Sequence, residues 1–251
     1  MVLDYSVSNI YAVRYRGCNA RVSEKWCFAL RSKDSTDEIF RSSFIFIADN
    51  RGTNTGHVAR PREFNLEEVL DKAVETFWSR GYEATSIQDL VESMGIHRGS
   101  LYAAFEDKQG LFLSVLDRYR KVVVGKLLDI LESDSSGKTA IRQFFAAVIE
   151  HVVTGGPLRG CLVTNSAVER GLSDPETAKK VRLCLTQLEE GFYKTLLRAQ
   201  GAGELDQGRD PRALARYLTS SLQGLLVIGK IRTDRAALED VVEVTLAACR
   251  T

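Results

Sequence analysis

Residues 97–108 concentrate side chains that can hydrogen-bond to a nucleic acid. Arg98 carries a planar guanidinium that can make paired hydrogen bonds to a guanine edge in the major groove, or to a phosphate. Gly99 has no side chain, so the backbone there can approach another molecule closely. The whole set of candidate contact residues is His97, Arg98, Gly99, Ser100, Tyr102 and Lys108. We expect Arg98 to read a base rather than only to pair with a phosphate.

Helices must position these residues, and the spacing of apolar side chains predicts three. The first ends at Gly81, and its apolar face consists of Val69, Leu70, Ala73, Val74, Phe77 and Trp78. A second helix begins at Thr85 or Ser86 and ends at Gly95, and a third covers residues 97–105. Two helices joined by a glycine turn are typical of a helix-turn-helix, whose second helix enters the major groove. The alternative is a corner within an ordinary helical bundle.

The second helix offers further polar groups to DNA. Thr85 or Ser86 supplies a hydroxyl that can cap its first turn. Gln88 points away from the apolar face, so it could reach a base edge or the DNA backbone. A merely solvated side chain is the alternative for Gln88.

The chain from residue 107 onward is also predicted to be helical. Asp107 caps a long helix whose apolar period continues through Val122 and Val123. Further helices are expected at about 138–154, 160–171, 174–200, 210–229 and 234–249. The fold class is therefore all-α.

The segment 59–119 resembles the DNA-binding region of the TetR family of bacterial repressors. The matching stretches are Ala-Val-Glu-Thr-Phe-Trp (73–78), Gly-Tyr-Glu-Ala-Thr-Ser-Ile (81–87) and Met-Gly-Ile-His-Arg-Gly-Ser-Leu-Tyr-Ala-Ala-Phe-Glu-Asp-Lys (94–108). The resemblance implies a three-helix helix-turn-helix head at 59–110, followed by a helical ligand-binding and dimerisation domain at 111–251.

The resemblance also implies roles for single residues. The start of the second helix, at Thr85 and Ser86, would face a phosphate, and Lys108 would hold another. Gly99 stands where many relatives have proline, a departure that argues against the family's usual apolar contact there.

Charge sets a condition on DNA binding. The chain has 34 basic and 33 acidic side chains, a net charge of +1. Residues 59–110 alone hold six basic and ten acidic groups, a net charge of −4. Such a region binds phosphates only if its cations gather on one face. We expect Arg60, Arg62, Arg98 and Lys108 to form that face.

Other classes of protein are disfavoured. The sequence has no Gly-rich phosphate loop, no GxSxG and no HExxH, so we expect no enzyme, no cofactor and no metal. No apolar stretch approaches the roughly 20 residues of a membrane-spanning helix. The five cysteines are scattered without CxxC spacing, which is typical of reduced thiols in a cytoplasmic protein.

The helices after residue 111 are expected to enclose a ligand and to form a homodimer. Candidate pocket residues are Tyr119, Phe145, His151, Cys161 and Phe192, with core packing as the alternative. The resemblance implies that the last two helices pair with their copies, through Leu214, Leu218, Leu222, Leu225, Leu238, Val241, Val242 and Thr245. An intramolecular core is the alternative for these. Cys161 follows Arg159 at a helix start, so a reactive thiolate is a hypothesis beside that of an inert buried cysteine.

Residues 1–58 differ in character from the rest. Only Ser43–Ala48 has a strand-like pattern, and the family's short basic arm would correspond to residues 59–62. Bacterial genes can start at valine codons, so Val58 could be the true start and residues 1–58 an over-extended gene prediction. A genuine basic extension that adds nonspecific DNA contacts is the alternative.

Together these features predict a ligand-responsive, DNA-binding transcriptional regulator. We expect a repressor that a small molecule releases from double-stranded operator DNA. The alternative is a helical adaptor or ligand-binding protein that does not bind DNA.

Overall fold

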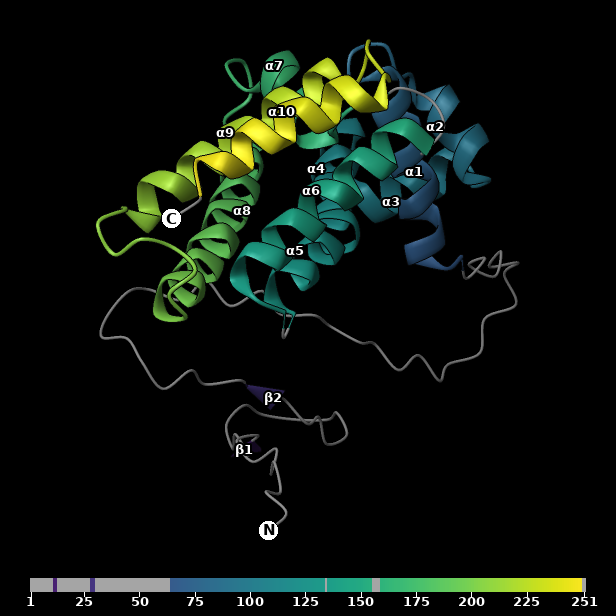
Figure 1. Cartoon of the computed structure of the whole chain (residues 1–251). Helices are drawn as coiled ribbons and strands as arrows, with labels where there is room; N and C mark the ends of the chain where they lie inside the picture. Colours follow the sequence, from purple (N-terminus) through teal and green to yellow (C-terminus); the bar gives the residue numbers. More distant parts are fainter. Residues whose placement is uncertain (1–10, 13–27, 30–63, 134, 155–158, 250–251) are drawn as a thin grey trace, which may run out of the picture. The chain divides into compact units, whose positions relative to one another are not determined.

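The computed structural model describes residues 11–12, 28–29, 64–133, 135–154 and 159–249 (Figure 1). Contacts divide the chain into two compact units, Met1–Ala59 and Arg60–Thr251. In the first unit, strands β1 (Tyr11–Ala12) and β2 (Phe28–Ala29) pair antiparallel. The predicted strand Ser43–Ala48, the possible start at Val58, and Arg60 and Arg62 all lie outside the described residues.

The second unit is helical throughout its described part, which confirms the all-α prediction for it. Its helices are α1 (Leu66–Arg80), α2 (Ile87–Met94), α3 (Arg98–Phe105), α4 (Lys108–Tyr119), η1 (Arg120–Val124), α5 (Gly125–Glu132), α6 (Gly137–Thr154), α7 (Leu162–Arg170), α8 (Pro175–Gly201), α9 (Pro211–Ile228) and α10 (Arg235–Ala247). No helix in these described ranges is long and apolar enough to cross a membrane.

Local signals explain most helix boundaries. The Asn65 side chain accepts the backbone N–H of Glu67 and so caps α1. Asp174 and Asp210 cap α8 and α9 in the same way, each followed by a proline at the first helical position. Gly95 ends α2 with φ 70° in the left-handed region. The helices predicted after residue 137 start and end within two residues of the expected positions where their ends are described.

The long helix predicted from Asp107 is interrupted. Its middle turn, η1, is a π-helix, which takes up one residue more than the α-helical repeat. The extra residue rotates the following side chains by about 100° relative to an unbroken helix. Val124 is therefore buried, whereas Val122 and Val123, expected in the core, are only partly buried.

Aromatic side chains fill the core of the helices after residue 111. Phe144, Phe145 and Phe192 are at most 1% exposed, and their ring centroids lie 4.8–6.0 Å apart. The long helix α8 packs against α9, and α10 lies against α6 and α9 (Figure 1). Phe145 and Phe192, expected in a ligand pocket, belong instead to this core, because neighbouring rings enclose them.

Candidate nucleic-acid interface

The third helix, α3, presents one face to the core and the other to solvent. Leu101 and Phe105 are buried, at 0% and 7% exposure, and fix the helix against the rest of the unit. His97 is its N-cap and is exposed, but its side chain makes no capping hydrogen bond. Ser100 is partly buried in the first turn. In this turn the Ser100 backbone N–H donates to the His97 carbonyl at 2.9 Å, so the candidate contacts are the exposed side chains.

The outer face of α3 carries the strongest candidate contacts. Arg98 is exposed and lies 5.9 Å from the centroid of the Tyr102 ring. Within the described ranges Arg98 forms no ion pair. Tyr102 is 41% exposed. A Cβ built on Gly99 would meet nothing within 4 Å, so the surface is open beside Arg98.

A reciprocal capping arrangement holds the start of α2. The Ser86 hydroxyl accepts the Asp89 backbone N–H at 3.1 Å, and the Asp89 carboxylate accepts the Ser86 N–H at 2.8 Å. Hydrogen bonds from Ser86 and Arg80 lower the pKa of Asp89 to about 2. Gln88 is exposed and donates to Glu92. Ser86 and Gln88 thus lie at the surface, as a DNA contact requires.

Thr85 has a different position from the one expected. It is 1% exposed, and its hydroxyl donates to the Gly81 carbonyl at 2.6 Å. The hydroxyl completes the turn between α1 and α2 and cannot face a phosphate. The expected DNA contact at Thr85 is therefore corrected to a structural one.

Lys108 is the first residue of α4. Its ammonium lies 4.2 Å from the centroid of the Tyr82 ring, a cation–π contact that orients the side chain. In the described residues it has no carboxylate partner, so its charge is available to a phosphate.

Arginines from outside residues 59–110 neutralise acids of the first helix. Arg118 on α4 donates to Asp71 at 2.7 Å and lies 3.3 Å from Glu67. The hydrogen bond from Arg118 lowers the pKa of Asp71. Arg118 therefore pairs with both carboxylates of the first helix.

Two more acids are matched in the same way. Arg159, which precedes α7, pairs with Glu75, and Arg170 at the end of α7 pairs with Glu83 at 2.7 Å. These three arginines, Arg118, Arg159 and Arg170, thus offset three of the four net negative charges of residues 59–110. Arg98 and Lys108 keep their charges unpaired within the described residues.

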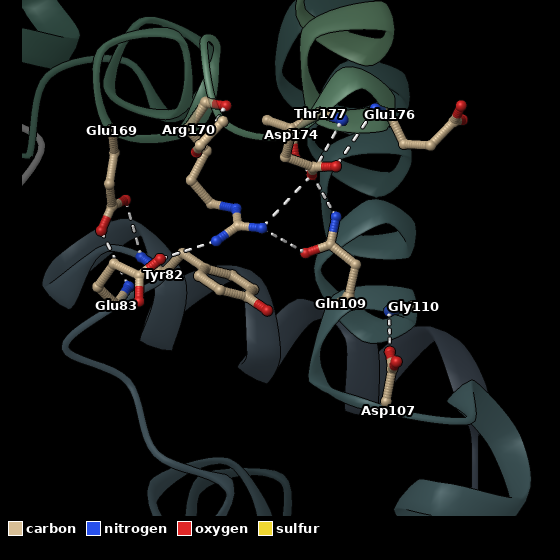
Figure 2. A network of polar contacts seen from close by, with 11 residues as sticks. Tyr82, Glu83, Asp107, Gln109, Gly110, Glu169, Arg170, Asp174, Glu176 and Thr177 are labelled. Atoms are coloured by element: carbon tan, nitrogen blue, oxygen red, sulfur yellow. Dashed lines mark hydrogen bonds and ion pairs between the residues drawn. The ribbon is translucent and has the colours of Figure 1, made fainter.

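The end of α7 is bound to the turn that precedes α2. The Glu169 carboxylate accepts the backbone N–H groups of Tyr82 and Glu83, each at 2.9 Å (Figure 2). Arg170 also donates to Gln109 at 3.1 Å, and its guanidinium lies 3.8 Å from the Tyr82 ring centroid. The helix-turn-helix therefore has a fixed connection to α7, one that sequence patterns did not reveal.

A cavity of about 290 Å³ lies between α1, α4, η1, α5, α6, α8 and α9. Of the expected pocket residues, Tyr119, His151 and Cys161 line it. Burial raises the pKa of Tyr119 well above its ordinary value, and its hydroxyl lies 3.7 Å from the Cys161 sulfur. Cys161 is the buried N-cap of α7, at a helix start as expected, and Arg159 pairs with Glu75.

Most of the expected dimer contacts are buried inside the chain. Leu214 is partly buried and Val241 is 42% exposed, but the rest have almost no surface left for a second copy: Leu218, Leu222, Leu225, Leu238, Val242 and Thr245. They face the chain's own core, because α8 and α6 pack on that side of α9 and α10. The expected interface therefore needs correction.

A second stripe on the same two helices is exposed to solvent, apart from the partly buried Ala237. Its members recur at three- and four-residue spacing and are small or apolar: Ala213, Tyr217, Ser220, Gly224, Val227 and Ile228 on α9, with Ala237, Val241 and Val244 on α10. We call these residues the α9–α10 outer face. The spacing of small and apolar residues in the sequence could have revealed this face, as a weaker stripe beside the buried one.

Known proteins resemble this chain over both of its helical parts. The sequence model described as "Bacterial regulatory proteins, tetR family" matches residues 69–115, and that described as "Tetracyclin repressor-like, C-terminal domain" matches residues 137–245. The HTH-type transcriptional regulator YezE of Bacillus subtilis is 39% identical over 191 residues, which cover 76% of this chain and 98% of YezE. The transcriptional repressor ComR of Escherichia coli is 31% identical over 186 residues, which cover 74% of this chain and 87% of ComR.

A solved structure shows the same fold. The TetR family regulator CifR, in a cysteine-substituted form complexed with 26-bp operator DNA, matches with a TM-score of 0.69 and 31% identity. The match covers 75% of this chain and 99% of CifR. With the helix-turn-helix, the regulatory helices and these relatives in agreement, the chain belongs to the TetR family of bacterial transcriptional regulators.

Proposed function

We propose that this protein is a repressor that binds operator DNA as a homodimer and leaves it when a small molecule occupies the cavity. The observation that carries the proposal is the outer face of α3, where Arg98 is exposed beside the open surface at Gly99 and lacks an acidic partner in the described residues. ComR is named a repressor, and the CifR structure contains operator DNA, which supports the same role here.

The residues divide into two kinds of contact. Arg98 reads a base edge in the major groove, and Tyr102 and Ser100 extend the same face. Ser86, at the start of α2, and Lys108, at the start of α4, contact phosphates on either side. Gln88 and His97, both exposed, are further polar contacts of this surface, and Arg60 and Arg62 supply the basic arm.

The homodimer forms through the α9–α10 outer face. Two copies joined by a two-fold axis place their α3 helices about one DNA turn apart, as paired half-sites require. A four-helix contact of small and apolar residues allows close packing between α9, α10 and their copies. Since the protein works on operator DNA, we place it in the cytoplasm.

Titration with labelled DNA tests the proposal. Fluorescence polarisation would follow binding of the full chain to DNA from upstream of its own gene, at two salt concentrations. We expect saturable, salt-sensitive binding that unrelated competitor DNA does not abolish. Weak binding of equal strength to all sequences would contradict the proposal and favour the helical adaptor.

A further inference from the structure

One wall of the cavity comes from the DNA-binding head. Trp78 lies on α1, yet its ring stacks with His151 on α6 at 5.6 Å and meets Tyr119 edge-on at 5.0 Å. Its indole N–H donates to the Gly160 carbonyl at 3.0 Å, immediately before α7. A molecule in the cavity therefore touches the head directly, without an intervening helix.

The walls of the cavity are mainly apolar and carry no carboxylate among the described residues that line it. Burial and the nearby charge of Arg159 lower the pKa of His151, so its imidazole is neutral at neutral pH. Lys126 is exposed, where water solvates its ammonium. A charged ligand would lose its hydration without gaining a buried partner of opposite charge.

Gln223 gives the cavity a hydrogen-bond donor that lacks an acceptor among the described residues. Its Oε1 accepts a hydrogen bond from the Thr164 hydroxyl, while its Nε2 is buried and has no partner among the described residues. A buried donor without a partner costs free energy, and a ligand that supplies an acceptor removes that cost. The cavity thus favours a molecule with a carbonyl-like oxygen.

The volume limits the size of this molecule. At about 290 Å³ the cavity is roughly twice as large as an engineered cavity of about 150 Å³ that binds benzene. One aromatic ring with a short polar substituent fits this space.

We propose that the cavity binds a small uncharged molecule whose apolar body packs on Trp78 and whose acceptor oxygen accepts a hydrogen bond from Nε2 of Gln223. This inference rests on the proposed function, since it names the class of effector. Packing on Trp78 competes with its contacts to His151 and to Gly160. Because Gly160 precedes α7 and Glu169 near the end of α7 holds the turn before α2, displacement of Trp78 also disturbs the position of α3.

Four probes with the same aromatic ring test the ligand class. Acetophenone carries a carbonyl and ethylbenzene carries no polar group. Benzoate is an anion and 1-phenylethylamine is a cation at neutral pH. Trp26→Phe leaves Trp78 as the only tryptophan of the chain, so emission reports on the cavity. We expect acetophenone to change the emission saturably, ethylbenzene to bind about tenfold more weakly, and the two ions not to bind.

Gln223→Leu provides the matched variant. It should reduce the affinity for acetophenone to that for ethylbenzene and leave ethylbenzene binding nearly unchanged. Equal affinities of the wild-type cavity for the ketone and the hydrocarbon, tighter binding of either ion, or no binding of any probe would overturn the inference. These probe measurements need no variant other than Trp26→Phe, so they test the ligand class even if Gln223→Leu does not fold.

Operator binding by the unliganded protein is measured separately. Loss of operator binding would contradict the proposed function. Intact operator binding without the expected preference among the probes would contradict only the ligand class.

Discussion

The Glu169 carboxylate, near the end of α7, accepts the backbone N–H of Tyr82 in the turn before α2. The same carboxylate also accepts the backbone N–H of Glu83, so α7 holds two successive peptide units of this turn. The N-cap of α7, Cys161, lines the cavity, while the last turn of α7 contacts the helix-turn-helix. One nine-residue helix thus joins the two places that a ligand-controlled repressor must connect.

Glu169→Gln should loosen this connection. The amide retains one acceptor oxygen but presents an N–H group to the second backbone N–H. We expect the free energy of unfolding to fall by about 1 kcal/mol, because the carboxylate is exposed, and operator affinity to fall about threefold to tenfold. Urea unfolding and DNA titration check both. Glu132→Gln, an exposed glutamate at the end of α5, is the control, and an equal effect there would contradict the role of Glu169.

Arg98→Ala and Lys108→Ala should both weaken operator binding, but in different ways. Loss of a base contact at Arg98 costs about 1–3 kcal/mol and reduces discrimination between sequences. Loss of a phosphate contact at Lys108 weakens binding to all sequences and lowers the salt-dependence slope by about one. Titrations over a salt series separate the two effects. Lys194→Ala removes an exposed charge on α8 and should leave binding unchanged; equal losses in all three variants would argue against a specific interface.

Gly99→Ala separates stability from DNA binding. A methyl group there meets nothing within 4 Å in the free protein, and alanine favours the helix, so stability should rise by about 0.5 kcal/mol. If the bare backbone approaches the groove closely, operator affinity falls despite the stabilisation. Thermal unfolding would show the rise in stability, and DNA titration would show the fall in operator affinity. Gly201→Ala, at the end of α8 and equally open, should stabilise without affecting DNA binding; unchanged operator affinity of Gly99→Ala would mean that no close approach occurs.

The sequence was most informative where the structure depends on residues that are close together in the chain. Caps such as Asn65 and Asp174, and the apolar spacing after them, predicted helices to within two residues. The π-helical turn at η1 was not predictable, because it shifts the repeat without a breaking residue.

Long-range partners could not be predicted from the sequence. Arg118 and Asp71 are 47 residues apart, and nothing local indicates that one neutralises the other. Trp78 was recognised as apolar and inward, but periodicity does not say whether a buried face meets a core or a cavity. For the same reason, periodicity does not distinguish a core stripe on α9 and α10 from an interface stripe.

Acid should remove the capping contribution of Asp89. Its pKa of about 2 lies below the ordinary value of 3.8, so ionisation stabilises the folded state above about pH 4. This contribution is lost as pH falls from about 4 to 2. Asp89→Asn should therefore be less stable than wild type near neutral pH, with the difference shrinking towards pH 2. Urea unfolding over this pH range tests it. Asp129→Asn controls for loss of a carboxylate on an exposed helix surface; a constant difference for Asp89→Asn would contradict the expected linkage.

Val244→Glu should separate the two copies of the proposed homodimer. Val244 is 70% exposed in the single chain and lies on the α9–α10 outer face, where a two-fold axis brings like residues together. A charge buried there without a partner destabilises the dimer, while the monomer fold keeps the side chain in water. Light scattering should show the monomer mass, circular dichroism should be unchanged, and operator affinity should fall at least tenfold, because one α3 helix reads only half of the site. Leu197→Glu, at a 43% exposed apolar position on α8, should remain dimeric. If Val244→Glu stays dimeric and Leu197→Glu does not, the subunits meet through α8 rather than through this face.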